Sequence, residues 1–100
     1  MRTPYPNLDE FFGTYFHQDW REDSKTARGI IERYLAEWPT QDIRATAEEL
    51  HRLLTEPLTE AELTDQMRLL GNFYNPNADG LSHRDWLRQV YELLSTNSAV

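Results

Sequence analysis

Cysteine is absent from the 100-residue sequence. This absence excludes a disulfide framework, a thiolate zinc site and a cysteine nucleophile. It fits a reducing compartment, so we expect a cytoplasmic protein. The sequence also lacks an apolar run long enough to span a bilayer, and its first residues lack the uninterrupted apolar stretch of a signal peptide. We therefore expect no membrane partner.

Basic residues are outnumbered by acidic ones. The sequence has 17 acidic and 10 basic residues, which gives a net charge of −7. The acidic residues are spread over both halves of the chain, whereas nucleic-acid binding requires a basic stripe. We therefore expect no nucleic-acid partner. The excess negative charge suits either a basic protein partner or simple solubility.

The most informative segment is an aromatic cluster near the N-terminus. Leu8 and the aromatic residues after it recur at i, i+3, i+4, i+7 and i+8, which is the spacing of one helix face. This spacing predicts a helix over residues 8–18, with Asn7 as its N-cap and Glu10 as the capping-box partner. An aromatic face of this kind is the expected centre of a small core. Its aromatic members are Phe11, Phe12, Tyr15 and Phe16.

Asp19 follows this face closely. If the helix continued, the Asp19 carboxylate would lie in the middle of the apolar side, where it would need a hydrogen-bonding partner. We therefore expect the helix to stop near His17 and Gln18. Asp19 should then turn inward and accept a hydrogen bond from backbone N–H groups or an aromatic donor. A role for Asp19 in partner binding or catalysis is the alternative.

Apolar spacing and capping residues predict four further helices. Asp23 or Ser24 is expected to cap the first of them, and Pro39 to end it. The next helix starts after Thr40 and runs to about Leu54.

The last two helices carry complete start signals. Thr59 and Glu62 form the pattern of a capping box, and Gly71 is placed as the C′ residue that ends the same helix. Ser82 caps the final helix, which should run to Leu94.

The segments outside the helices are short. We expect residues 1–6 to be an irregular lead-in and residues 95–100 to be a frayed tail. Two aromatic residues in the loop over residues 72–80, Phe73 and Tyr74, should pack back onto the body. The sequence thus predicts an all-α fold, a compact bundle of about five short amphipathic helices in one domain that spans the chain.

No motif in the sequence carries recognisable catalytic or metal chemistry. Residues 75–80 imitate the start of an EF-hand loop, but Trp86 stands where that loop requires a bidentate glutamate. The three histidines lie on separate predicted elements and form no helix-spaced zinc pair. We therefore assign no catalytic, cofactor or metal site. A small enzyme that uses His17, Asp19 and a second carboxylate is an alternative.

Several short strings together resemble a known family. The sequence resembles the all-helical branch of the CdiI-type immunity proteins of bacterial contact-dependent growth inhibition (CDI) systems, over roughly residues 4–94. The resemblance rests on YFHQDW at residues 15–20, YPNL at residues 5–8, residues 71–74, and GLS at residues 80–82 leading into Trp86 and Leu87.

This resemblance implies a function. A protein of this kind would act in the cytoplasm of the producing cell, without catalysis or a cofactor. It would bind the C-terminal toxin domain of its own CDI effector stoichiometrically and neutralise it. The toxin is often a nuclease, whose basic cleft would suit an acidic inhibitor. The alternative is a helical adaptor or scaffold that binds another protein or a peptide.

The resemblance also separates expected structural residues from expected contact residues. Immunity proteins of one fold serve different toxins, so residues of the shared motif should be structural. That set is Tyr15, Phe16, Asp19 and Trp20. From charge and expected exposure, we predict that acidic residues of the surface contact the toxin. These are Glu22, Asp23, Asp42, Glu48 and Glu49.

Overall fold

Six α-helices and one short 3₁₀-helix form the part of the chain that the computed structural model describes, residues 3–98. No strand occurs in this part, so the all-α prediction is confirmed, and none of its helices is long and apolar enough to cross a bilayer. The helices are α1 (Pro6–Tyr15), α2 (Trp20–Asp23), α3 (Ala27–Glu37), α4 (Thr40–Thr55), α5 (Glu60–Leu69) and α6 (His83–Ser98), and the 3₁₀-helix η1 spans Pro76–Asp79.

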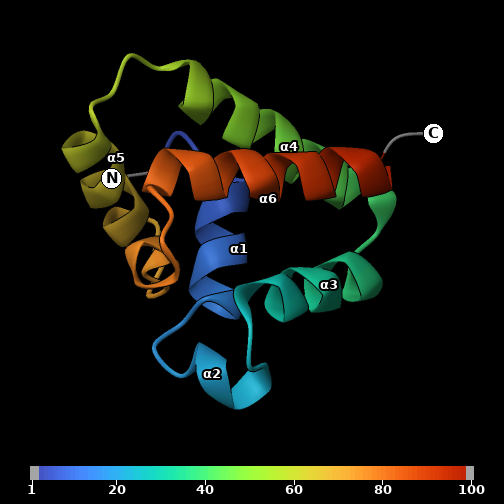
Figure 1. Ribbon diagram of the computed structural model, residues 1–100. Coiled ribbons are helices and arrows are strands. Elements are labelled where there is room, and N and C mark those ends of the chain that lie inside the picture. Colours follow the sequence, from blue (N-terminus) through green and yellow to red (C-terminus); the bar gives the residue numbers. More distant parts are fainter. Residues whose placement is uncertain (1–2, 99–100) are drawn as a thin grey trace.

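The two longest helices form the main packing pair. Helices α4 and α6 lie side by side, and α1 crosses them (Figure 1). Helix α1 packs against α4 and α3, while α3 and α5 both pack against α6. The aromatic face of α1 therefore packs against α3 and α4, and the Phe12 ring also lies 5.9 Å from that of Trp86 on α6.

The aromatic face of α1 lies at the centre of the core, as the spacing predicts. Phe11, Phe12 and Phe16 are completely or almost completely buried. The Phe11 ring lies 4.5 Å from that of Tyr34 on α3, and the Phe16 ring lies 5.3 Å from that of Trp86 on α6, as centroid distances. Ring pairs at these separations add to the free energy of burial. The same cluster thus joins the first helix to the middle and the end of the chain.

The predicted start and end of the first helix are wrong. Helix α1 begins two residues earlier than expected, with Pro6 in its first position and Tyr5 as N-cap. Proline fits this position because its fixed φ suits a helix and its missing N–H would have no partner there. Asn7 consequently lies inside the helix and is not its cap. The helix also ends at Tyr15, three residues before the predicted end.

The predicted cap of the next long helix is wrong as well. Thr26, rather than Asp23 or Ser24, caps α3, and its hydroxyl accepts from the Gly29 N–H at 3.0 Å. Ser24 instead bonds the backbone of Thr26. A Cβ atom on Gly29 would lie 2.1 Å from the Ser24 hydroxyl oxygen, which explains the glycine in this helix.

The later helices begin as the sequence predicts. The capping box of α5 is complete: Thr59 accepts from the Glu62 N–H, and the Glu62 carboxylate accepts from the Thr59 N–H. The Ser82 hydroxyl accepts from the Asp85 N–H at the start of α6. Helix α6 then continues to Ser98, so the prediction of a frayed tail is wrong for residues 95–98.

Two parts of these predictions cannot be compared with the structure. Residues 1–2 of the expected lead-in and residues 99–100 of the expected tail lie outside the described residues.

Gly71 ends α5 in the predicted C′ position. Its φ is +86°, and the backbone forms the two hydrogen bonds of a Schellman motif, from Gly71 N–H to Arg68 C=O and from Asn72 N–H to Met67 C=O. A Cβ atom on Gly71 would lie 3.1 Å from the Cα of Gly13 on α1. The motif therefore brings the end of α5 directly against the backbone of α1.

One of the two loop aromatics does not pack back onto the body. Tyr74 is buried, but Phe73 is 61% exposed. The Asn72 side chain bonds both the N–H and the C=O of Tyr74, and the Phe73 N–H donates to the Phe16 C=O at 2.8 Å. Successive side chains of an extended chain point in opposite directions, so burial of Tyr74 turns Phe73 outward.

The two glycines with positive φ provide a test of the contact between α1 and α5. Replacing Gly71 with alanine should lower the free energy of unfolding by about 1–3 kcal/mol, because the residue has φ +86° and its Cβ would crowd the α1 backbone. Gly80→Ala is the control, since Gly80 has φ +80° but nothing within 4 Å of a Cβ. Urea unfolding should show the larger loss for Gly71→Ala, and equal losses would contradict the packing argument.

Candidate protein-binding surface

Glu49 on α4 reaches the N-terminus of α1. One carboxylate oxygen accepts from the backbone N–H of Asn7 at 2.8 Å and from that of Leu8 at 3.1 Å, and the other accepts from the Asn7 side-chain amide. The first N–H groups of a helix have no partner within it, and a negative charge there is favoured by the helix dipole. Glu49 therefore caps α1 from another helix.

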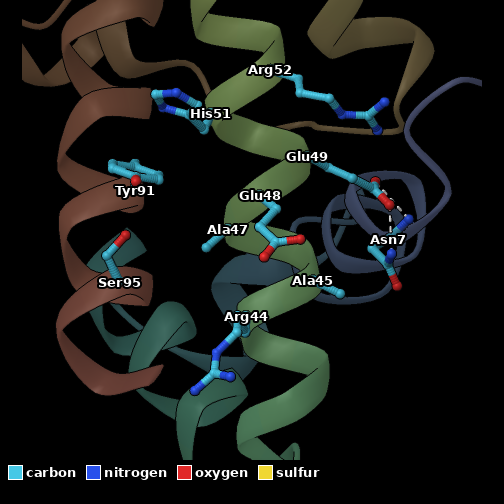
Figure 2. A pocket seen from close by; sticks show the side chains of 10 residues that line it. All are labelled: Asn7, Arg44, Ala45, Ala47, Glu48, Glu49, His51, Arg52, Tyr91 and Ser95. Atoms are coloured by element: carbon cyan, nitrogen blue, oxygen red, sulfur yellow. Dashed lines mark hydrogen bonds between the residues drawn. The ribbon is translucent and has the colours of Figure 1, made fainter. Parts of the chain in front are cut away.

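The expectation that Glu49 is exposed is consequently wrong. Glu49 is buried, with only 7% of its surface exposed, whereas the neighbouring Glu48 faces solvent. Consecutive helical residues point about 100° apart, so one of them faces α1 while the other faces solvent. Figure 2 shows the two side chains leaving α4 in different directions, with Glu49 directed to Asn7.

Glu48 lines an open groove between α4 and α6 (Figure 2). The groove has a volume of about 620 Å³ and combines charged, polar and small apolar side chains. Arg44 and His51 line it from α4, and Tyr91 lines it from α6, where its ring lies 5.6 Å from that of His51. A groove of this volume can receive side chains of another protein.

The other predicted contact residues lie in two places. Asp42 is half-buried at the start of α4, and Glu22 is exposed on α2. Helix α3 separates these two positions, and its 11 residues span about 16 Å. Asp23 is exposed, but it bonds His17 Nε2 at 2.9 Å and lies 3.5 Å from an Arg33 nitrogen. The hydrogen bond from His17 lowers the pKa of Asp23.

Three residues of the 15–20 motif form part of the packed structure. Phe16 and Trp20 are buried, and Tyr15 is half-buried. The Tyr15 hydroxyl donates to a Glu37 carboxylate oxygen at 2.6 Å and accepts from Trp38 Nε1 at 2.8 Å. Burial and the bond to Glu37 raise the pKa of Tyr15 to about 12.

Asp19 is the exception among the four motif residues that were predicted to be structural. Its side chain is exposed and caps nothing, so the expectation that it turns inward is wrong. The expectation placed the end of the helix near His17 and Gln18, directly before Asp19, but α1 already ends at Tyr15 and Asp19 is the residue before α2. The Asp19 N–H donates to His17 Nδ1 at 3.1 Å.

The three histidines are not brought together. His17 bonds Asp23, His51 lies beside Tyr91, and His83 is buried at the start of α6. Across residues 3–98, no group of three histidine or acidic side chains is arranged to hold a metal ion.

The comparisons with known proteins identify the family. A family model described as CdiI immunity protein matches residues 4–94. The chain belongs to the CdiI immunity protein family. The resemblance in the sequence is therefore confirmed, and it covers every helix up to most of α6. Comparison with curated proteins and with solved structures gave no match.

Family membership implies neutralisation of a toxin in a CDI system. It indicates that this CdiI family protein is an inhibitor rather than a catalyst, and that it binds a cognate CDI toxin.

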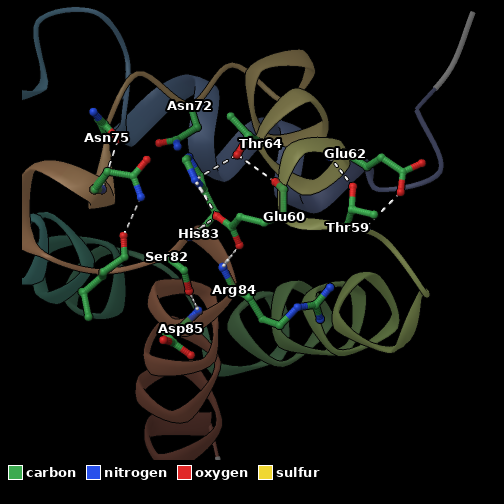
Figure 3. Close-up of polar contacts among 12 residues, drawn as sticks. Thr59, Glu60, Glu62, Thr64, Asn72, Asn75, Ser82, His83, Arg84 and Asp85 are labelled. Atoms are coloured by element: carbon green, nitrogen blue, oxygen red, sulfur yellow. Dashed lines mark hydrogen bonds and ion pairs between the residues drawn. The ribbon is translucent and has the colours of Figure 1, made fainter.

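In this CdiI family protein, a second carboxylate also caps a helix that lies far from it in the sequence. Glu60 in the first turn of α5 accepts from the backbone N–H of His83 at 2.7 Å and from that of Arg84 at 3.3 Å (Figure 3). His83 Nδ1 lies 3.2 Å from the same carboxylate and 3.1 Å from the Thr64 hydroxyl. That hydroxyl donates to the Glu60 C=O, so we assign the proton to Nδ1.

Sequence reasoning missed both of these long-range caps. Glu49 lies about 40 residues after the N–H groups it binds, and Glu60 lies 23 residues before His83. A capping box is visible in sequence because its partners are three residues apart. A cap supplied by another helix has no fixed spacing, so no signal in the sequence could have shown it.

The cap on α1 predicts that alanine substitution at two neighbouring positions changes the stability of the protein by very different amounts. Glu49→Ala should lower the free energy of unfolding by about 1–3 kcal/mol, because it leaves the N–H groups of Asn7 and Leu8 without an acceptor. Glu48→Ala makes the same exchange on the exposed side of α4 and should change stability by less than about 0.5 kcal/mol. Thermal and urea unfolding of both variants measures this, and similar losses would refute the cap.

The cap on α6 predicts a pH dependence. Burial alone would raise the pKa of Glu60, but hydrogen bonds from the His83 and Arg84 amides and from the His83 ring lower it. A lowered folded-state pKa stabilises the protein fully above the unfolded value of about 4.3. That stabilisation is lost as the pH falls through the folded-state value.

Urea unfolding of the wild-type protein and of Glu60→Gln, measured at several pH values between 7 and 3, tests this dependence. The stability difference between them should be largest near neutral pH and should shrink below about pH 4.5. A difference that stays constant over this range would show that the charge of Glu60 does not contribute.

Proposed function

We propose that this protein binds, in a one-to-one complex, the C-terminal toxin domain of the CDI effector encoded beside it, and that the toxin is a nuclease. The observation that carries the proposal is the family match over residues 4–94. The complex would form in the cytoplasm of the producing cell, where an unrestrained nuclease would otherwise reach the cell's own nucleic acid. The inhibitor would act by occupancy and would not turn over a substrate.

The charge of the protein supports a nuclease as the partner. A nuclease must hold a polyanion, so its substrate cleft is lined by basic side chains. A partner with a net charge of −7 is attracted to such a cleft over a distance of about a Debye length, roughly 8 Å at physiological salt. This attraction mainly raises the association rate and disfavours partners of the wrong charge.

The acidic contact surface proposed here is smaller than the set predicted from sequence. We retain Glu48, Glu22 and Asp42 as contact residues, because the first two are exposed and the third is half-buried. Glu49 is left out because its carboxylate caps α1. Asp23 is held by His17 and Arg33, so it would have to give up those contacts to bind a toxin.

A titration of the toxin domain tests the proposal directly. Calorimetry with the C-terminal domain of the neighbouring effector should give one inhibitor per toxin, and an equimolar amount should abolish cleavage of RNA or DNA. Absence of binding would overturn the proposal and favour the adaptor reading. Tight binding of a toxin that cleaves no nucleic acid would overturn the nuclease assignment alone.

The place of Glu48 in the contact surface predicts a kinetic effect. Glu48→Lys should slow toxin association about tenfold at low salt and should make the rate less sensitive to added salt, since an attraction has been removed. Glu92→Lys is the matched control: it makes the same charge change on an exposed residue of α6 that lines a different groove. Equal effects of the two variants in stopped-flow measurements would show that only net charge matters.

A further inference from the structure

Two large apolar side chains are exposed at the end of α5. Leu69 is 78% exposed and Phe73 is 61% exposed, and within residues 3–98 no other large apolar side chain is classed as exposed. They lie four positions apart, on either side of the Gly71 turn. We call this pair the apolar ridge. Large apolar side chains exposed on an otherwise polar surface, and close together in the chain, are a candidate interaction site.

The backbone beneath the apolar ridge is fixed at several points. The Schellman hydrogen bonds hold Gly71 and Asn72, and the Phe73 N–H donates to the Phe16 C=O at 2.8 Å. The Asn72 side chain is bonded to the backbone of Tyr74. The exposure of Phe73 is therefore imposed by its ordered neighbours. A rigid contact residue loses little conformational entropy when a partner binds, which favours affinity.

A groove lies beside each member of the apolar ridge. Phe73 lines one of about 490 Å³, together with Met67 and His83, and Leu69 lines another of about 510 Å³, together with Tyr5 and Leu58. The last turn of α5 contributes to both grooves. Each of the two exposed side chains thus lies beside a hollow, and another protein surface can fit both features.

We propose that the apolar ridge is the docking site through which this protein holds its cognate toxin domain. This rests on the proposed function. Apolar and aromatic anchors that become fully desolvated supply most of the binding energy of a protein interface, and they act mainly by slowing dissociation. The ridge would thus set how long the complex lasts, while the acidic surface sets how fast it forms.

The charges near the apolar ridge indicate the chemistry of the partner. Glu56 lines the groove beside Leu69, and Glu62 and Asp65 are exposed on α5. Arg68 lines the groove beside Phe73, but its charge is offset by Asp65, which lies 3.6 Å away. A second copy of this chain would bring its own net charge of −7 against the same acidic rim, which is unfavourable. The fitting partner presents an apolar patch surrounded by basic residues, as a domain that binds nucleic acid can.

Dissociation kinetics test the docking site. The full chain, its Phe73→Ala variant and its Leu69→Ala variant are measured against the immobilised toxin domain, with Gln41→Ala as a control at an exposed position of α4. Each ridge variant should dissociate about tenfold faster or more, with little change in association rate, and the control should behave as wild type. Phe73→Leu should retain most of the affinity because it keeps an apolar side chain.

Melting temperatures of the variants show whether a faster dissociation comes from the lost contact or from loss of folding. Both ridge side chains are mostly exposed, so the variants should melt as wild type does; if Phe73→Ala is unstable, Leu69→Ala carries the test. Unchanged dissociation while wild type binds tightly would overturn the docking site and leave the proposed function intact. Failure of wild type to bind the toxin would overturn both. Self-association of wild type that Phe73→Ala abolishes in sedimentation would assign the ridge to a second copy and overturn the proposal.

Discussion

The free N–H groups at helix starts are the constraint on which this fold depends. A chain with several short helices has many such starts, and each one leaves N–H groups that must find acceptors. Two of the starts lie where helices pack together, and a carboxylate from another helix satisfies each of them. Glu49 of α4 serves α1, and Glu60 of α5 serves α6. Each bond also fixes how two helices lie relative to each other.

These caps change the meaning of the protein's acidic composition. A net charge of −7 suggests a surface available for electrostatic contact. Part of that charge is instead used internally: by Glu49 and Glu60 at helix starts, by Glu62 in its own capping box, and by Asp23 with His17 and Arg33. The acidic surface left for a partner is therefore smaller than the composition indicates. Of the adjacent pair Glu48 and Glu49, for example, only Glu48 is exposed.

The sequence predicted what depends on local spacing. The aromatic face of α1, the capping box at Thr59, the Ser82 cap and the Gly71 terminus all follow from residues within one or two helical turns of each other. Predictions failed where distant residues decide the outcome. Asp19 was expected inside because the end of α1 was misplaced, and Glu49 was expected outside because its partners on α1 are far away in sequence. The contact residues themselves depend on a second protein, whose shape this sequence does not encode.

The hydrogen bond between Phe73 and Phe16 has a consequence for local opening of the protein. Segments with few buried contacts open frequently on their own, whereas amides within the core exchange their hydrogens only when the whole structure unfolds. The Phe73 amide belongs to a surface segment, yet its acceptor is the backbone of the residue whose ring packs against Trp86. This segment cannot detach without breaking a bond to the backbone of a core residue, so we expect it to open less often than a surface segment that lacks such a bond.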